Sequence, residues 1–433
     1  MNAPTDQATD PEERNALVAL RARGFPVTDI QILARDQNAF ARRSPYGEHV
    51  IAPGVRLTAR PVELEDGFTN AFTLTVDLDR AQCHAVSSSA GFHLRDLVRD
   101  RVVAAVSGSF SYISDEPAYQ PTEPCLDLAI RDGRVAGLPT ATKPALLISQ
   151  GRPEVRLLTA VGTLTAAGHL HTWAGSKEPR PQQDQPGHLT VYTAANCRIR
   201  YRDNARTGFL RDVDPTTNTT PFTPGALDCA VSPAPDGLKI TAVRPGGGAD
   251  LFAGAFILRA HRPWPGHLAV GAPVRVTSVD TVGVEQLRSA LSLGPSVMDA
   301  ADGHTEAWDQ SLGTSPFRPA ARYARTLLAL RDRTLQLQVL DGAPLTRDFQ
   351  GATVRETADL CTAAGLDPVQ VFHLDGGQTS KIAFRRERRA PDVVGSLHYL
   401  KWPATDGEPF RWQGLDGRLL RSALVITISR GPR

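Results

Sequence analysis

Residues 369–380 read VQVFHLDGGQTS and form the most informative stretch of the chain. The apolar positions from Val369 to Phe372 predict a short strand, and the loop after it carries a carboxylate, two glycines and two hydroxyls. Glycines let a backbone approach a ligand closely, and a rigid sheet holds a loop at a strand end in place. The segment therefore predicts a ligand site, although Asp-Gly-Gly is also an ordinary turn sequence.

The residues before this loop give strand and helix signals in turn. Residues 334–340 alternate as a strand that ends at Asp341, and Arg325 lies shortly before that strand. Thr353 and Glu356 have the spacing of a capping box, which predicts a helix from residue 353 to residue 364. The last third of the chain therefore contains both strands and a helix.

The first two thirds of the chain read mainly as strands, with one helix predicted at residues 94–101. Loops rich in Pro, Gln and Thr are predicted near residues 173–187 and 202–224, as functional lids or as mobile insertions. Together with the last third, this pattern predicts an α+β fold of mixed β-sheets flanked by helices. The strands are predicted at residues 50–57, 71–78, 102–106, 126–130, 145–148, 189–193, 238–243 and 274–279.

The chain has 433 residues, which exceeds the roughly 250–300 residues at which a single core stops growing. Asp10, Pro11 and the acids after them predict a leader helix, so residues 1–45 are expected to be a helix and linker. Residues 46–433 are expected to form the main domain, as one unit or as two lobes.

The composition excludes several classes of protein. A formal net charge of +2 gives no field that would attract nucleic acid or a membrane surface. Five cysteines at long spacings fit buried thiols better than a disulfide framework. The start of the chain has no apolar run of signal-peptide length, so we predict a soluble, cytoplasmic protein. The sequence leaves its oligomeric state open.

The order of these motifs resembles that of the phosphodiester glycosidase family. That family has an R-T motif, a strand ending in D-G, a helix opened by T-x-x-E, and an L-D-G-G-G-S-[ST] loop. The corresponding residues here are Arg325, Asp341, Thr353 and Asp375. Ser107-Gly108-Ser109-Phe110 sits where the family has N-G-G-F-F, and the resemblance covers roughly residues 50–430.

The resemblance implies a site at the Asp375 loop. Asp375 is the candidate catalytic carboxylate, because glycosidic cleavage needs a carboxylate at an oxocarbenium-like centre. Asp341 is a second carboxylate candidate or a turn residue, and His373 is an acid–base candidate or a core histidine. Arg325 is the candidate clamp for a phosphate. The expected substrate-binding residues are Arg325, Thr326, Gly376, Gly377, Gln378, Thr379, Ser380, Ser107 and Ser109.

The expected function is hydrolysis of a sugar phosphodiester or a related small glycosyl substrate inside the cell, without a cofactor. Ser107, Ser109 and Gln378 depart from the family motifs, which leaves open a lyase, cyclase or transferase acting on a biosynthetic intermediate. A non-catalytic carbohydrate- or phosphate-binding module is a further alternative. No metal site is predicted: His169 and His171 share a strand face, but no third ligand is evident in the sequence.

Overall fold

The computed structural model describes residues 47–112, 122–123, 125–178, 188–202, 210–308, 317–342, 351–386, 389–396, 400–401, 411–412 and 419–428. Of the residues described, 55% lie in strands and 11% in helices, so the predicted α+β fold of helix-flanked mixed sheets is wrong. The predicted leader helix and linker at residues 1–45 lie outside this part of the chain.

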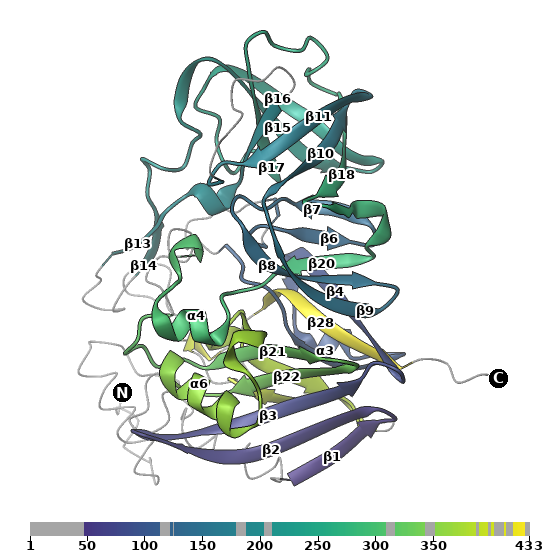
Figure 1. Ribbon diagram of the computed structural model, residues 1–433, viewed down its shortest axis with the longest axis vertical. Helices are drawn as coiled ribbons and strands as arrows, with labels where there is room; N and C mark the ends of the chain where they lie inside the picture. The colour runs from purple at the N-terminus through teal and green to yellow at the C-terminus, as the bar shows by residue number, and fades with distance from the viewer. Residues whose placement is uncertain are drawn as a thin grey trace, which may run out of the picture.

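Two large sheets form the two ends of the molecule (Figure 1). The six-stranded sheet runs, in spatial order, β1 (Gly47–Ala52), β2 (Val55–Leu64), β3 (Gly67–Asp77), β22 (Thr334–Leu340), β21 (Arg325–Arg331) and β23 (Val371–Leu374). The eight-stranded sheet runs β10 (Val161–Ala166), β11 (His169–Gly175), β12 (His188–Tyr192), β17 (Phe256–His261), β15 (Phe222–Ala234), β16 (Gly237–Gly247), β18 (Pro273–Val279) and β19 (Val282–Gly283). It closes on itself because β10 also pairs with β18.

Two five-stranded sheets lie between these ends. One runs β7 (Arg134–Gly137), β6 (Ala129–Arg131), β20 (Ser289–Ser292), β8 (Lys143–Ser149) and β9 (Arg152–Leu158). The other runs β25 (Asp392–Gly395), β24 (Lys381–Phe384), β5 (Val102–Ser107), β28 (Leu420–Ile428) and β4 (Ala81–Phe92). The pairs β13 (Ile199–Arg202) with β14 (Leu210–Val213), and β26 (Leu400–Lys401) with β27 (Arg411–Trp412), complete the described strands. Among the pairings of these strands, only β11 with β12 is parallel.

The sheet that contains β8 is buried on both faces. Leu146 and Ile148 point into a core shared with the six-stranded sheet and with β4, β5, β24 and β28. Ala145 and Leu147, on the opposite face, point into the core of the closed eight-stranded sheet. Alternate side chains of a strand face opposite ways, so a continuous apolar run is what a strand between two cores requires.

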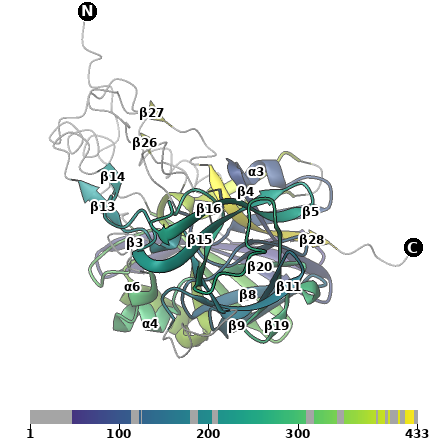
Figure 2. The ribbon, with the colours of Figure 1, turned by 90° about the horizontal axis from the view of Figure 1, so that it is seen from above.

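The helices cover only part of the sheets. Those with complete bounds are α3 (Leu94–Leu97), α4 (Val297–Asp302) and α6 (Val354–Ala363), and residues 306–308 are also helical. The 3-10 turns are η2 (Ala194–Asn196), η3 (Val284–Gln286), η4 (Pro368–Gln370) and η5 (Gly377–Thr379). Figure 2 shows α4 and α6 together on one flank and α3 on another. Ala358 and Cys361 of α6 pack against Leu327 and Val371, on one face of the six-stranded sheet. The fold prediction was wrong because α4 and α6 cover one face of the six-stranded sheet and the single turn α3 packs on the sheet of β5, while strands build most of the rest.

Several local predictions are confirmed. The strand at 334–340 has the predicted bounds, and the capping box of α6 is formed as predicted. The Thr353 hydroxyl accepts a hydrogen bond from the Glu356 N–H at 3.2 Å, and the Glu356 carboxylate accepts one from the Thr353 N–H at 2.8 Å. These contacts span three residues, so the sequence alone specifies them.

Other local predictions are wrong. The helix at 94–101 is a single turn, α3, because Asp100 takes a positive φ of 50° in the turn that leads into β5. The expected loop at 173–187 begins inside β11, where Trp173 is buried in the core. The expected loop at 202–224 contains β14 and the start of β15. Pairing with other strands, together with the burial of Trp173 and Val213, overrides the loop-like composition.

Candidate functional site

The Asp375 loop begins where β23 ends, at an edge of the six-stranded sheet. Thr326 of β21 pairs with Leu374 of β23 in the antiparallel register. Arg325 and Asp375 are the next residues along these strands, so they lie opposite each other. The Asp375 side chain is half-buried, and its Oδ1 atom accepts a hydrogen bond from the Gly376 N–H at 3.0 Å. The sheet thus presents a partly accessible carboxylate on a short, bonded turn.

A second loop, at the end of β5, meets the Asp375 loop. The Asp375 N–H donates to the Gly108 carbonyl oxygen at 2.9 Å, and the Gly108 N–H donates to the Ser422 carbonyl oxygen at 3.1 Å. A Cβ atom at Gly108 would lie 2.7 Å from the Ser422 hydroxyl and 2.8 Å from the Ala423 nitrogen. Glycine at this position therefore allows the contact that brings residues 107–110 to the Asp375 loop, as the motif order predicts.

The hydroxyl groups expected to bind substrate are used inside the protein. The Ser107 hydroxyl donates to the Thr379 carbonyl oxygen and accepts from the Lys381 N–H, the latter at 3.1 Å. The Thr379 hydroxyl donates to the Gly376 carbonyl oxygen at 2.8 Å. Ser107 is fully buried, so its hydroxyl stabilises the Asp375 loop from inside the protein.

Ser109 and the pair Thr326–Ser380 have the same bracing role. The Ser109 hydroxyl donates to the Ser292 carbonyl oxygen at 2.6 Å, which ties the β5 loop to β20. The Thr326 hydroxyl donates to the Ser380 hydroxyl at 3.0 Å, and both side chains are buried. These contacts hold the loop in one geometry, which is what a preorganised site requires of its supporting residues.

The glycines that follow Asp375 pack against the start of β21. The Gly377 N–H donates to the Ala324 carbonyl oxygen at 2.8 Å, and Gly377 has a φ of 66°, which favours glycine. The N–H groups of Gly376 and Gly377 are therefore both engaged within the protein. Gln378 lies within η5 by its main chain, and its side chain is outside the described part of the chain.

Arg325, the first residue of β21, is buried beside the Asp375 loop, with 2% of its surface exposed. Its Nε atom donates to the Ala352 carbonyl oxygen at 3.1 Å, and its Nη2 atom donates to the Ala321 carbonyl oxygen at 3.0 Å. The guanidinium also lies 5.5 Å from the centre of the Tyr323 ring. Burial lowers the pKa of Arg325 to about 10. These contacts indicate that Arg325 holds the segments on either side of β21 together. Few N–H groups of its guanidinium remain to bind a phosphate.

His373 is 1% exposed and faces the segment that precedes α4. Its Nδ1 atom lies 3.2 Å from the Pro295 carbonyl oxygen, which only accepts hydrogen bonds, so Nδ1 carries the proton. Burial and the nearby charge of Arg325 lower the pKa of His373 to about 3. Within the described residues its Nε2 atom has no hydrogen-bond partner. His373 is therefore a neutral core histidine at pH 7, and the predicted acid–base role finds no support in these contacts.

The buried neutral state of His373 predicts acid sensitivity. Its folded-state pKa of about 3 lies below the ordinary value of 6.5, so between these values only the unfolded chain binds the proton. This group should therefore lower the free energy of unfolding by about 3 kcal/mol from pH 7 to pH 4. His373→Asn, whose amide can still donate to Pro295, should remove that share of the pH dependence in urea unfolding.

The exposed His304 provides a matched control for this measurement. His304→Asn should leave the pH dependence of the unfolding free energy as in the wild type. The raised pKa of Asp341 changes the free energy of unfolding in the opposite direction over the same pH range. Asp341 is present in the wild type, in His373→Asn and in His304→Asn, so its contribution cancels when the three are compared. Identical pH profiles for the wild type and His373→Asn would contradict a neutral, buried His373.

Asp341 closes β22 and is held on both carboxylate oxygens. Its Oδ1 accepts from the Asn70 N–H at 2.9 Å, and its Oδ2 accepts from the Asn70 amide at 3.3 Å. Burial raises the pKa of Asp341 to about 7, against the hydrogen bonds from Asn70 that favour the charged form. With 4% of its surface exposed, the residue ties β22 to β3 in the way the turn interpretation predicts.

Residues 292–295 connect the Asp375 loop with the rest of the molecule. The Gly294 N–H donates to the His373 carbonyl oxygen at 2.8 Å, and the Leu293 N–H donates to the Pro144 carbonyl oxygen at 2.8 Å. A Cβ atom at Gly294 would lie 2.7 Å from the Phe110 ring and 2.8 Å from the His373 Cβ. The segment thus touches β23, the β5 loop and the start of β8.

A buried ionic group lies beside this segment and was missed at the sequence level. The Lys143 Nζ atom forms an ion pair with Asp127, and both side chains are 2% exposed. Lys143 also lies 5.5 Å from the centre of the Trp308 ring, whose N–H donates to the Leu293 carbonyl oxygen at 3.1 Å. One signal was present, since Lys143 is one of only five lysines and opens an otherwise apolar strand.

Lys177 extends this group toward η2. Its Nζ atom donates to the Ala195 carbonyl oxygen at 3.0 Å. Burial and the neighbouring charge of Lys143 lower the pKa of Lys177 to about 8, against the attraction of Asp127. Two lysines and one carboxylate leave this group with a net positive charge at pH 7, which suits an anionic ligand.

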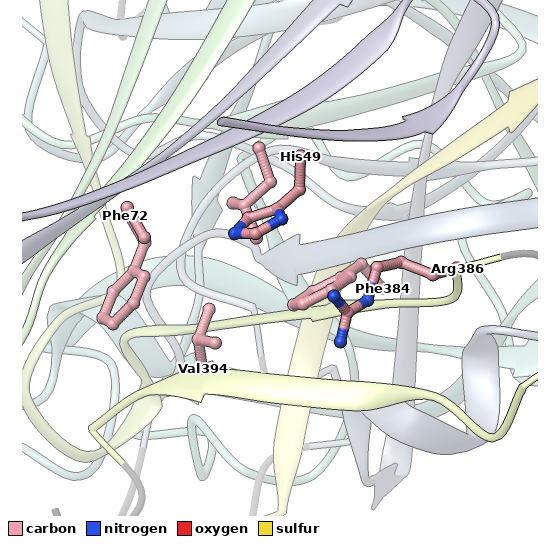
Figure 3. A pocket seen from close by; sticks show the side chains of 7 residues that line it. His49, Phe72, Phe384, Arg386 and Val394 are labelled. Atoms are coloured by element: carbon pink, nitrogen blue, oxygen red, sulfur yellow. The ribbon is translucent and has the colours of Figure 1, made fainter. Parts of the chain in front are cut away.

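A small cavity lies elsewhere, between the six-stranded sheet and β24 and β25 (Figure 3). Its volume is about 10 Å³, enough for about one water molecule. Apolar side chains line most of it, and the Arg386 guanidinium lies 5.9 Å from the centre of the Phe384 ring (Figure 3). A cavity of this size and lining does not hold a sugar.

The comparisons with known proteins give only distant similarities. No protein-family model matches the chain, and no curated protein matches its sequence. A hypothetical protein from Synechocystis is similar in structure, with 16% sequence identity and a TM-score of 0.49. That similarity covers 87% of this chain and 63% of the Synechocystis protein, so the chain spans less than two thirds of it.

Two further solved structures are distantly similar to the chain. A protein of Burkholderia pseudomallei that is named as exported has 18% identity and a TM-score of 0.47, over 83% of this chain and 74% of its own. The catalytic domain of zebrafish N-acetylglucosamine-1-phosphodiester alpha-N-acetylglucosaminidase has 10% identity and a TM-score of 0.36, over 89% and 87%. The similarity to this enzyme domain is weak and lies at the level of the fold. At these scores none of the three carries an argument about function.

Among the described residues, no helix is long and apolar enough to cross a membrane. The five cysteines are buried and free of disulfide bonds, as the sequence predicts. The cytoplasmic location stays a prediction.

Proposed function

We propose that the chain is an intracellular hydrolase of the glycosidase type that cleaves a sugar phosphodiester or a related small glycosyl substrate. Asp375 is its catalytic carboxylate, which attacks or stabilises the oxocarbenium-like centre at the sugar carbon. The motif order that resembles the phosphodiester glycosidases supports this proposal, as does the contact between the Gly108 and Asp375 main chains.

The observation that carries the proposal is the contrast in burial among the ionisable candidates. Asp375 is half-buried, whereas Arg325, His373 and Asp341 are 2%, 1% and 4% exposed. A catalytic group must touch its substrate, so the accessible carboxylate takes the catalytic role. The proposal assigns Arg325 and Asp341 to positioning, since both are bonded to neighbouring strands and loops.

The proposal places the anionic end of the substrate near Lys177. A phosphodiester needs a cation to hold its phosphate, and the guanidinium of Arg325 is largely engaged by carbonyl oxygens. Lys177 is only partly buried, and Lys143 beside it already neutralises Asp127. Residues 292–295 contact both regions, since the Trp308 N–H beside Lys143 donates to the Leu293 carbonyl oxygen and the Gly294 N–H donates to the His373 carbonyl oxygen.

The proposed function is tested with two substrates that share a sugar and a leaving alcohol. One is a sugar phosphodiester, and the other is the neutral glycoside of the same sugar without the phosphate. On a simple N-acetylglucosamine phosphodiester, the departures at Ser107 and Gln378 predict poor activity. We expect hydrolysis of the diester of the preferred sugar at a kcat of about 1 s⁻¹ or more, and at least tenfold slower hydrolysis of the glycoside. Lys177→Met should raise KM for the diester, whereas Lys239→Met, a control on the distant strand β16, should not.

Labelled water distinguishes the alternatives in the same assay. Incorporation of one oxygen-18 atom from water into a product supports hydrolysis. A product that is unsaturated, cyclised or transferred to another acceptor would contradict it and favour a lyase, cyclase or transferase. Binding of the diester without turnover would contradict any enzyme and favour a binding module.

A further inference from the structure

Three histidine side chains meet on the closed eight-stranded sheet. Strands β11 and β17 of this sheet lie at the opposite end of the molecule from β21 and β22 (Figure 1). His169 and His171 lie two residues apart on β11, so both side chains point to the same face of that strand. His267 comes from the connection between β17 and β18. The sequence shows the first two but gives no sign of the third, which lies almost a hundred residues further along the chain.

The three rings are in direct contact. The Nε2 atoms of His171 and His267 lie 2.8 Å apart. The rings of His169 and His267 are stacked, with centroids 3.9 Å apart and an interplanar angle of 13°. His171 is 4% exposed, whereas His169 is exposed and covers one face of the His267 ring. The Nε2 atoms of His171 and His267 are therefore close together, and the exposed ring of His169 covers the His267 ring.

The chain around His267 holds it in this place. Leu268 is buried in the core of the closed sheet, and its N–H donates to the Pro265 carbonyl oxygen at 3.1 Å. Trp264, earlier in the same connection, donates its ring N–H to the Gly225 carbonyl oxygen at 2.8 Å. An anchored loop on one side and a strand on the other thus hold the two nitrogens close together.

We propose that His171 and His267 bind a divalent transition metal ion, through their Nε2 atoms. A metal at about 2.1 Å from each of two cis imidazole nitrogens holds those nitrogens about 3.0–3.4 Å apart. The observed 2.8 Å is slightly shorter, so a metal can replace the shared proton after a small opening of the pair. Imidazole nitrogens select copper, nickel and zinc over magnesium or calcium.

The remaining coordination positions belong to water in this proposal. Within the described residues, no group of three or more His, Cys, Asp or Glu side chains is arranged to hold a metal ion. His169 therefore acts as a stacking partner that orients the His267 ring.

Calorimetric titration of the chelator-treated full chain with CuCl₂, NiCl₂ and ZnCl₂ tests this proposal. We expect one site per chain, with copper bound most tightly, as the general order of metal affinities requires. Cu²⁺ bound through imidazole nitrogens should also give a nitrogen hyperfine pattern in electron paramagnetic resonance. His267→Gln and His171→Gln should each weaken copper binding at least tenfold, and His169→Gln should weaken it by less than threefold.

His304→Gln, a change of an exposed histidine elsewhere, is the matched control and should leave the binding unchanged. Replacing the buried His171 could unfold the protein. His267 is only partly buried, so His267→Gln is expected to stay folded and still tests the site. Copper binding that survives both His171→Gln and His267→Gln in folded protein would overturn the proposal. So would an equal loss of binding in His304→Gln.

Discussion

Replacing Asp228 by alanine should destabilise the protein by about 3–5 kcal/mol, because it leaves a buried arginine without its counter-ion. Asp228 of β15 lies opposite Arg259 of β17, and the side chains are 0% and 3% exposed. The Arg259 Nε and Nη2 atoms donate to the two Asp228 oxygens at 2.7 and 3.0 Å. The Thr220 hydroxyl also donates to this carboxylate. Urea unfolding of the wild type and of Asp228→Ala measures this loss of unfolding free energy.

An exposed ion pair of the same chemistry is the control. Glu48 and Arg56 lie 3.2 Å apart, but both side chains are more than half exposed. Glu48→Ala should change the free energy of unfolding by less than about 1 kcal/mol, since water screens such a pair. Removing both buried charges at once, in Asp228→Leu with Arg259→Met, should recover part of the loss. A loss below 1 kcal/mol for Asp228→Ala would contradict the buried ion pair.

Asp375→Asn should lower turnover of the phosphodiester by about a thousandfold or more while the protein stays folded. The amide has the size of the carboxylate and keeps an oxygen that can accept the Gly376 N–H, so the loop retains its hydrogen bond. It lacks the negative charge that attacks or stabilises the sugar centre. Steady-state kinetics and urea unfolding of the same preparation separate the loss of activity from any loss of stability.

Asp359→Asn is the matched control, since Asp359 lies exposed on α6. It makes the same chemical change away from the site and should leave both kcat and stability within error of the wild type. Turnover of Asp375→Asn within threefold of the wild type would remove Asp375 from the catalytic role. A large loss of stability in that variant would instead indicate that the carboxylate serves the fold.

Most of the predicted substrate-binding side chains around Asp375 are buried and bonded within the protein. Ser107 and Thr379 use their hydroxyls to bond the loop, and Arg325 bonds the carbonyl oxygens of neighbouring segments. Such groups fix the geometry of the carboxylate, and a site held in one geometry needs less reorganisation when substrate binds. Substitutions at these positions should therefore act mainly through the position of Asp375.

Part of the candidate site could be predicted from the sequence. The Asp375 loop and residues 107–110 share a motif order that anticipates their meeting, and the Gly108–Asp375 contact follows that order. The ionic group of Asp127, Lys143 and Lys177 could not be predicted in this way. Its members come from separate segments, and their proximity depends on how the β8 sheet packs against its neighbours.

The sequence by itself determined the local elements, such as the α6 capping box and the strand β22. Contacts between residues three or four apart, and alternation within one strand, set these elements without reference to the rest of the chain. Only the tertiary structure decided that β22 pairs with β3, since Gln336 and Thr75 are neighbours across the sheet but distant in sequence. It also decided which charges are desolvated. Burial makes His373 neutral and leaves Asp375 accessible, because the free energy of a charge depends on the solvent that folding removes.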